Sequence, residues 1–287
     1  MHWIRSCRIG NIEANYKMKN IKIIAIDVDG TLLNSKKELT PKVKNAILKA
    51  KSAGIKIVIA TGRPLSGVEK ILTELGLDSQ EDQYVVCFGG GVVETTAGNV
   101  LFEKKLTYDN YLDLETISLK LGLHFHVSAP DRIYTADRDI GDYTLYEANL
   151  VNLGISYRTP AEMKDIPIIK CMYVDRQDLL DQKIADHKPF AHLDDKITFT
   201  KTASFYYEAN PKGVSKGNAL KFLCHKLNLS SENLMAIGDE ENDLSMIKLA
   251  GIGVAMGNAV PAVKEAAQRV ASDCDHDGVA EAIEKIL

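Results

Sequence analysis

Several features that mark particular classes of protein are missing from this sequence of 287 residues. Its five cysteines are odd in number and scattered, and none of them forms the CxxC pair of a zinc knuckle. No apolar run is long enough to span a membrane, and a net charge of −4 gives no basic surface for nucleic acid. We therefore expect a globular, cytoplasmic protein with reduced thiols, whose partners include neither nucleic acid nor a membrane.

The first twenty residues differ from the rest of the chain. They lack the apolar core of about 7–15 residues that a secretory signal peptide requires, and they precede the first strand-like run. We expect residues 1–20 to be an N-terminal appendage without a catalytic role.

The segments 21–88 and 209–287 share one pattern, in which short apolar runs alternate with amphipathic helical stretches. This pattern predicts a parallel sheet covered by helices on both faces. The strands expected here are IKIIAID, IKIVIA, YVVCF, LMAIGD, IGVAM and RVA, and the helices include residues 41–54 and the stretch from Pro64 to Gly76.

Residues 89–208 show a different pattern, in which hairpins and helices are mixed. A polar turn at Thr95–Asn99 separates two short strands, and ITFTKT and FYYEAN form a second hairpin signature. Helices are expected over 108–122, 139–150 and 176–187, with strands at LHFHV and IIKCMYV. The sequence therefore predicts an α/β core domain, 21–88 with 209–287, interrupted by an inserted α+β domain at 89–208.

Carboxylates follow two of the expected core strands. Asp27 and Asp29 come directly after the first strand, and Asp239 and Asp243 follow LMAIGD. Ligands of open parallel sheets collect outside the carboxyl ends of the strands, so these acids are expected to converge. Crowded like charges require a cation, and Mg²⁺ with oxygen ligands is the usual one where phosphate is handled. We therefore expect all four acids to take part in a Mg²⁺ site.

Groups suited to phosphate are expected at the same edge. Thr61 offers a hydroxyl and Gly62 a backbone N–H, while Lys216 offers a positive charge at a helix N-terminus. Asn242 lies between the later acids. Arg63 is equally compatible with binding phosphate and with pairing an acid at the domain edge.

The segments DVDGT, TGR, the lysine of SKGNAL, and GDEEND resemble, in this order, the four motifs of the haloacid dehalogenase superfamily. The resemblance extends from residue 21 onward. The inserted domain resembles the type IIB cap of Cof-type, YidA-like sugar phosphatases, which implies a Rossmann-like core. It also implies that Asp27 is the nucleophile and Asp29 the general acid and base. Thr61 and Lys216 would hold phosphate, and Asp239 with Asp243 would hold the metal.

One segment departs from the family pattern. An asparagine often stands where the chain enters the cap, but here the sequence is Phe88-Gly89-Gly90-Gly91. This difference bears on substrate choice more than on chemistry. We interpret the three glycines as a hinge. His124 and His126 are expected to pack in the cap or contact substrate in preference to binding a metal, and Tyr206 with Tyr207 to pack beneath the cap.

These observations favour a Mg²⁺-dependent phosphatase that acts on small phosphorylated metabolites through an aspartyl-phosphate. Two alternatives remain. The chain could be a phosphomutase of the same superfamily, or a non-catalytic sugar-phosphate sensor. The intact pair of Asp27 and Asp29 argues against a sensor, because binding alone does not need an acid beside a nucleophile. The spacing of residues names neither the substrate nor an oligomeric state.

Overall fold

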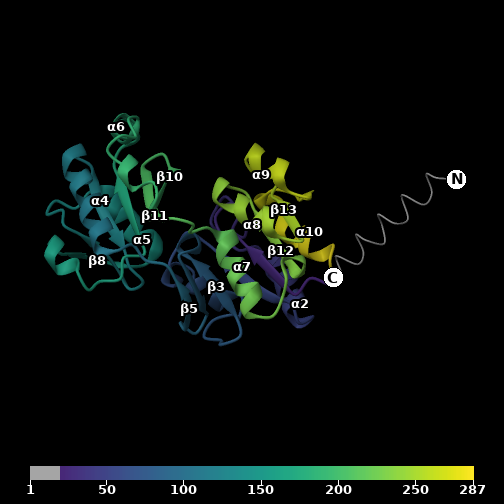
Figure 1. Cartoon of the computed structure of the whole chain (residues 1–287). Helices are drawn as coiled ribbons and strands as arrows, with labels where there is room; N and C mark the ends of the chain where they lie inside the picture. Colours follow the sequence, from purple (N-terminus) through teal and green to yellow (C-terminus); the bar gives the residue numbers. More distant parts are fainter. Residues whose placement is uncertain (1–19) are drawn as a thin grey trace. The chain divides into compact units, whose positions relative to one another are not determined.

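The computed structural model describes residues 20–287, so the expected appendage lies almost entirely outside the described residues. The chain forms two compact units. The core unit comprises residues 20–62, 70–100 and 215–287, and the cap unit comprises residues 63–69 and 101–214. In Figure 1 the core unit combines the purple and blue part of the chain with the green and yellow part. Segments far apart in sequence therefore build one unit.

The core unit is organised around an eight-stranded sheet, whose edge strand β5 extends into the first residues of the segment 101–214. The strand order is β14-β13-β12-β1-β2-β3-β4-β5, with β1 parallel to both β12 and β2. The four residues of β1 are fully buried, as expected for a parallel strand covered on both faces. The bounds are β1 Ile23–Ile26, β2 Lys56–Ala60, β3 Tyr84–Cys87, β4 Val92–Thr95, β5 Val100–Glu103, β12 Leu234–Gly238, β13 Ile252–Ala255 and β14 Arg269–Val270.

Helices cover this sheet. In α2 (Pro41–Ser52), Thr40 caps the N-terminus by accepting the Val43 N–H, and Pro41 supplies a preset backbone angle at the first position. The helix buries Val43, Ala46, Ile47 and Ala50, which is the helical spacing seen in the sequence. The other core helices are α3 Glu69–Glu74, α7 Lys216–Lys226, α8 Leu244–Leu249, α9 Pro261–Ala266 and α10 Gly278–Glu284.

One expected helix is interrupted. The stretch from Pro64 to Gly76 forms a 3-10 turn, η1 (Leu65–Gly67), and the separate helix α3. Residues 63–69 belong to the cap unit and residues 70–100 to the core unit, so the chain changes units inside this stretch. The helical periodicity could not reveal this, because both pieces have helix-like spacing.

The cap unit contains a six-stranded sheet in the order β10-β11-β9-β6-β7-β8. Helices α4 (Tyr108–Leu121) and α6 (Gln177–Ile184) contribute to an aromatic core with Tyr173, Phe190 and Tyr207. Strands β7 and β8 were not expected from the sequence. The remaining bounds are β6 His124–Ser128, β7 Arg132–Thr135, α5 Asp142–Val151, β8 Gly154–Tyr157, β9 Lys170–Val174, β10 Ile197–Ala203 and β11 Tyr206–Pro211.

The boundaries between the two units differ from those of the inserted domain expected at 89–208. β4 hydrogen-bonds to β3 in antiparallel register, with Val86 opposite Val93, so the first hairpin extends the core sheet. The chain enters the large segment of the cap unit between Val100 and Leu101 and leaves it between Val214 and Ser215. Hairpin periodicity identifies strands without saying which sheet they join.

No helix within residues 20–287 has the length and apolar character needed to cross a bilayer. Cys87, Cys171, Cys224 and Cys274 are free thiols.

Candidate active site

Three polar residues follow three neighbouring strands of the core sheet. Asp27 follows β1, Thr61 follows β2, and Asp239 follows β12. The Asp27 N–H donates to the Ile237 carbonyl over 3.0 Å, and the Thr61 N–H donates to the Val86 carbonyl over 2.8 Å. Because parallel strands end at the same edge, all three residues follow strands at that edge, and the carboxylates of Asp27 and Asp239 lie close together there.

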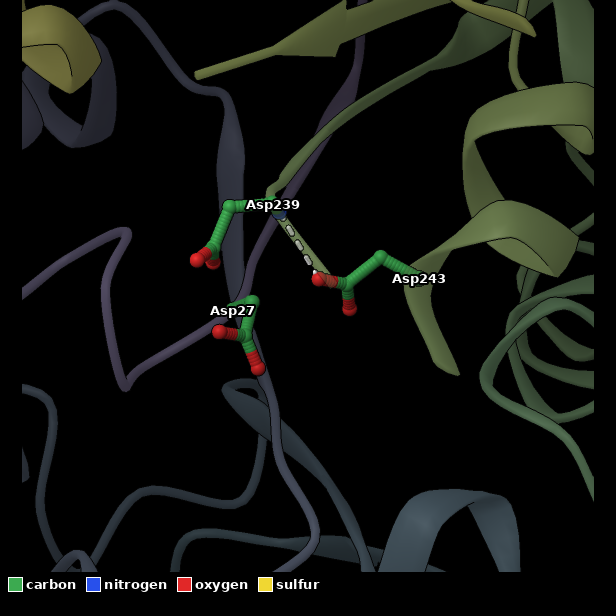
Figure 2. A group of neighbouring side chains, drawn as sticks. All are labelled: Asp27, Asp239 and Asp243. Atoms are coloured by element: carbon green, nitrogen blue, oxygen red, sulfur yellow. Dashed lines mark hydrogen bonds between the residues drawn. The ribbon is translucent and has the colours of Figure 1, made fainter. Parts of the chain in front are cut away.

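The acids form a buried cluster. One carboxylate oxygen each from Asp27, Asp239 and Asp243 lies within 4.8 Å of the others. Figure 2 shows these carboxylates turned toward one common region. Asp243 accepts hydrogen bonds from the N–H groups of Asp239, at 2.9 Å, and Glu240, at 3.1 Å. The backbone at the end of β12 therefore holds the Asp243 carboxylate in place.

Lys216, the first residue of α7, is fully buried among these acids. Its Nζ donates to Asp27 Oδ1 over 2.5 Å and to Asp243 Oδ1 over 2.6 Å. Burial by itself lowers the pKa of a lysine, but the charges of Asp27 and Asp243 outweigh it and raise the pKa of Lys216. Lys216 is therefore charged in this cluster.

Too much negative charge remains in the cluster. Three carboxylates and one ammonium carry a formal charge of −3 + 1 = −2. Burial, then the charge of Asp243, raises the pKa of Asp27 to about 8 despite the proximity of Lys216. Burial also raises the pKa of Asp239 to about 6. These carboxylates would favour their charged forms if a further positive charge joined them.

The donor set fits a hard divalent cation. All three acids offer oxygen, which Mg²⁺ prefers. Thr31 Oγ1 donates to Asp239 Oδ1 over 2.6 Å, and Asn258 Nδ2 donates to Asp239 Oδ2 over 3.1 Å, which orients that carboxylate. A Cβ on Gly30 would come within 2.4 Å of Asp239 Oδ2, so only glycine leaves room for it.

Asp29 has a different environment from the three clustered acids. Its side chain is 41% exposed, and Lys37 Nζ lies 2.8 Å from Asp29 Oδ1. Of the four acids expected at the metal, the structure thus groups three, and the Asp29 carboxylate is not part of that group. Exposure to solvent suits a group that exchanges protons.

The expected phosphate-binding residues are placed as follows. Thr61 is buried, Gly62 is partly exposed, and Asn242 is exposed on the 3-10 turn η6 (Glu241–Asp243) beside Asp243. Arg63 belongs to the cap unit, where its guanidinium donates to the Gly67 carbonyl over 3.1 Å. Thr61 and Lys216 thus both belong to the core unit, while Arg63 does not.

Two contributors to the site were missed by the sequence analysis. Lys37 pairs with Asp29, and Asn258 bridges Asp239 and the Gly30 carbonyl, which it contacts at 2.8 Å. Asn258 follows β13, the neighbour of β12. Applying the strand-end rule to this strand would have found it. The sequence carries no comparable signal for Lys37.

The cap histidines are packed in the interior or paired with an acid. His126 is fully buried, with Nδ1 3.1 Å from Thr144 Oγ1, and burial lowers its pKa to about 3. His124 Nδ1 lies 3.1 Å from Asp137 Oδ2. The acid cluster of the core is the metal-ligand group found among the described residues, and it contains neither histidine.

The sequence profile of the haloacid dehalogenase-like hydrolases matches residues 24–283. A protein of Streptococcus pyogenes serotype M6, provisionally named a phosphatase, is 44% identical over 93% of this chain and 98% of its own. The Bacillus subtilis phosphatase YwpJ is 31% identical over 93% of this chain and all of its own.

Another Bacillus subtilis relative is named 5-amino-6-(5-phospho-D-ribitylamino)uracil phosphatase YcsE. It is 30% identical over 92% of this chain and 95% of its own. Among solved structures, a haloacid dehalogenase-like hydrolase from Bacteroides thetaiotaomicron superposes with a TM-score of 0.83. It is 32% identical and covers 93% of this chain and all of its own. Together with the acid cluster, these matches show that the chain belongs to the haloacid dehalogenase-like hydrolases and is a phosphatase, a phosphoric monoester hydrolase.

Proposed function

We propose that the protein hydrolyses small phosphorylated metabolites through an aspartyl-phosphate, with Asp27 as nucleophile. The observation that carries the proposal is the position of Asp27. Its carboxylate lies at the end of a buried central strand, 2.5 Å from the Lys216 ammonium and beside Asp239 and Asp243. Such a carboxylate is held rigidly where phosphoryl charge can be neutralised.

In the first step an oxygen of Asp27 attacks phosphorus, and the bond from phosphorus to the alcohol oxygen breaks. Asp29 donates its proton to the departing alkoxide. In the second step Asp29 takes a proton from water, whose oxygen attacks phosphorus and releases inorganic phosphate from Asp27. Lys216 and Thr61 hold the phosphoryl oxygens throughout, which is the main requirement of phosphoryl transfer.

The cofactor in this proposal is Mg²⁺, held by Asp27, Asp239 and Asp243. When bound, it supplies positive charge that favours the ionised carboxylates and the phosphoryl group. The chain itself supports the fit through three clustered carboxylates that share one ammonium, and through the oriented carboxylate of Asp239.

The substrate class is proposed to be sugar phosphates and similar monoesters, including phosphorylated cofactor precursors. The relative named for a phosphoribitylamino-uracil substrate supports the broader range. A phosphate monoester presents the same oxygens whatever alcohol it carries, so the cap unit is expected to select the alcohol. Contacts in an apolar pocket discriminate by about 10–200-fold each, and several substrates should be accepted.

We also place the enzyme in the cytoplasm, since its described cysteines are free thiols. A phosphomutase of the same superfamily is the second candidate, because the chemistry of the first step is shared. It would pass the phosphoryl group to a second hydroxyl instead of to water.

The experiment is a screen of phosphorylated metabolites for release of inorganic phosphate. Rapid quenching with labelled substrate should trap one phosphoryl group on the wild-type enzyme and none on Asp27→Asn. Transfer of label to another position of the sugar would support the mutase. Binding of sugar phosphates without turnover would contradict both and support a sensor.

A second experiment tests the division between the units. The cap unit is exchanged for that of a relative with another substrate, and the substrate preference is expected to change with it. If the preference stays with the core unit, the proposed role of the cap is wrong.

A further inference from the structure

Two glycines lie against the backbone that carries Lys216. Gly90 lies in the turn after β3, and a Cβ there would come within 2.2 Å of the Ser215 carbonyl oxygen. Gly217 follows Lys216 in α7, and its Cβ would come within 2.4 Å of the Ser245 carbonyl oxygen. Cβ atoms essentially never approach other atoms within 3.0 Å. The residues before and after Lys216 are therefore packed so closely that any added methyl group must displace backbone.

The turn that contains Gly90 has an unusual backbone. Phe88, Gly89 and Gly90 have φ angles of 52°, 64° and 106°, three left-handed residues in succession. A left-handed bulky residue such as Phe88 is uncommon, and such conformations persist where the surroundings over-determine them. The Gly89 N–H also donates to the Thr61 carbonyl over 2.9 Å. One turn thus contacts the backbone of Thr61 and of Ser215.

Gly217 is held by a residue of α8 instead of by that turn. Its N–H donates to Ser245 Oγ over 3.0 Å, in addition to the close approach of the Ser245 carbonyl. Glycine is a poor helix former, and alanine would favour α7 by itself. Glycine at this position therefore serves the packing of α7 against α8 at the cost of helix propensity.

The Lys216 side chain needs an accurately placed backbone. It is fully buried, and its single ammonium contacts Asp27 at 2.5 Å and Asp243 at 2.6 Å. A shift of α7 at its first turn would lengthen one contact or both. We propose that Gly90 and Gly217 are positioning residues, which together fix the Lys216 ammonium between the nucleophile and the acid cluster. This inference rests on the role of Lys216 in the proposed function.

The first test compares three glycine-to-alanine variants by steady-state kinetics with p-nitrophenyl phosphate. A misplacement of about 1 Å can cost on the order of 10²-fold, so Gly90→Ala and Gly217→Ala are each expected to lower kcat by about that factor. Gly98→Ala is the control. Gly98 also has a positive φ, 89°, but its Cβ would meet nothing within 4 Å. We expect its kcat to stay within about twofold of wild type, which separates backbone strain from displacement of Ser215.

The second test asks whether the loss acts through Lys216. Gly90→Ala and Gly217→Ala are each combined with Lys216→Met, and coupling is read from the double-mutant cycle. We expect either alanine to lower kcat by less than about threefold once Lys216 is absent. The inference is wrong if the fold-losses in kcat of the single variants multiply in the double variant. It is also wrong if the glycine variants keep the wild-type kcat. If Gly90→Ala does not fold, Gly217→Ala decides the matter.

The two proposals fail differently. If Lys216→Met alone keeps wild-type kcat, the role of Lys216 in the proposed function is wrong, and the positioning role is wrong with it. If Lys216→Met loses activity while both folded glycine variants keep it, only the positioning role is wrong.

Discussion

Each unit of the molecule buries a lysine beside carboxylates, with different results. In the core unit, Lys216 contacts Asp27 and Asp243, and Asp239 adds a third acid. In the cap unit, Lys170 Nζ lies 3.0 Å from Glu208 Oε1. Glu208 also accepts hydrogen bonds from Thr202 and Asn210. The cap carboxylate is thus supplied with donors, whereas the core carboxylates are crowded.

The pKa values show the consequence. Burial by itself raises the pKa of Glu208, but Lys170 and the hydrogen bonds from Asn210 and Thr202 outweigh it, so the net shift is downward. Burial and Asp243 raise the pKa of Asp27. A buried ion pair in which the acid has a lowered pKa indicates a structural role. A cluster of acids with raised pKa values and too little positive charge indicates a binding site for a ligand.

The largest expected effect is that of Asp27→Asn. Loss of a nucleophile should lower kcat by at least about 10⁴-fold, because no other side chain replaces it. The matched control is Asp82→Asn, which removes an exposed carboxylate of the same unit. Phosphate release measured with a sensitive assay decides the point, and native turnover by Asp27→Asn would exclude this residue as nucleophile.

Removal of the cation is expected to have the next effect. Excess chelator should reduce phosphate release to background, Mg²⁺ should restore it, and Ca²⁺ should not. Ca²⁺ accepts more ligands and looser geometry, which would misplace the Asp27 carboxylate. Undiminished turnover in chelator would contradict the metal role of Asp27, Asp239 and Asp243.

Asp29→Asn is expected to lower kcat by about 10²–10⁴-fold, the usual value of general acid and base catalysis. Alkyl phosphates should lose more than p-nitrophenyl phosphate, whose leaving group needs little protonation. The measurement is the ratio of kcat values for the two substrates. An equal loss for both would show that Asp29 does not protonate the leaving group.

In the cap, Lys170→Met should lower the free energy of unfolding and leave the kcat of phosphate release unchanged. Removing one partner of a buried pair costs about 3–5 kcal/mol, because Glu208 would remain buried and charged without its counter-ion. Urea unfolding should show this loss, and Lys170→Met/Glu208→Gln should recover most of it. A kcat that fell as far as in Asp27→Asn would place Lys170 in the chemistry.

The smallest expected effect is a pH dependence from His126, whose pKa burial lowers from 6.5 to about 3. Below pH 6.5 the unfolded chain binds a proton that the native state refuses, so stability falls as pH falls between 6.5 and 3. The slope is about 1.4 kcal/mol per pH unit. His126→Gln should abolish a loss of stability of roughly 2 kcal/mol between pH 6.5 and 5. Equal slopes in both proteins would contradict a neutral buried His126.

Much of the site could be predicted from the sequence, because its residues directly follow strands that the sequence pattern identifies. Apolar runs predict the buried strands, and parallel strands end at one edge, so Asp27, Thr61 and Asp239 were expected at that edge, where the structure groups Asp27 with Asp239. Lys37 could not be predicted, since its contact with Asp29 depends on the path of a loop. Asn258 could have been predicted, because it follows β13 at the same edge of the sheet.

The sequence by itself determined the order of the core strands, the interrupted α/β core and the residues at the strand ends, but not the cap strands β7 and β8. These depend on periodicity and on residue type within a few positions. Only the tertiary structure decided that the first hairpin joins the core sheet, that the stretch after Pro64 is divided between the units, and that Gly90 and Gly217 lie against the backbone beside Lys216. Such contacts join residues far apart in sequence, and their distances depend on how whole elements pack.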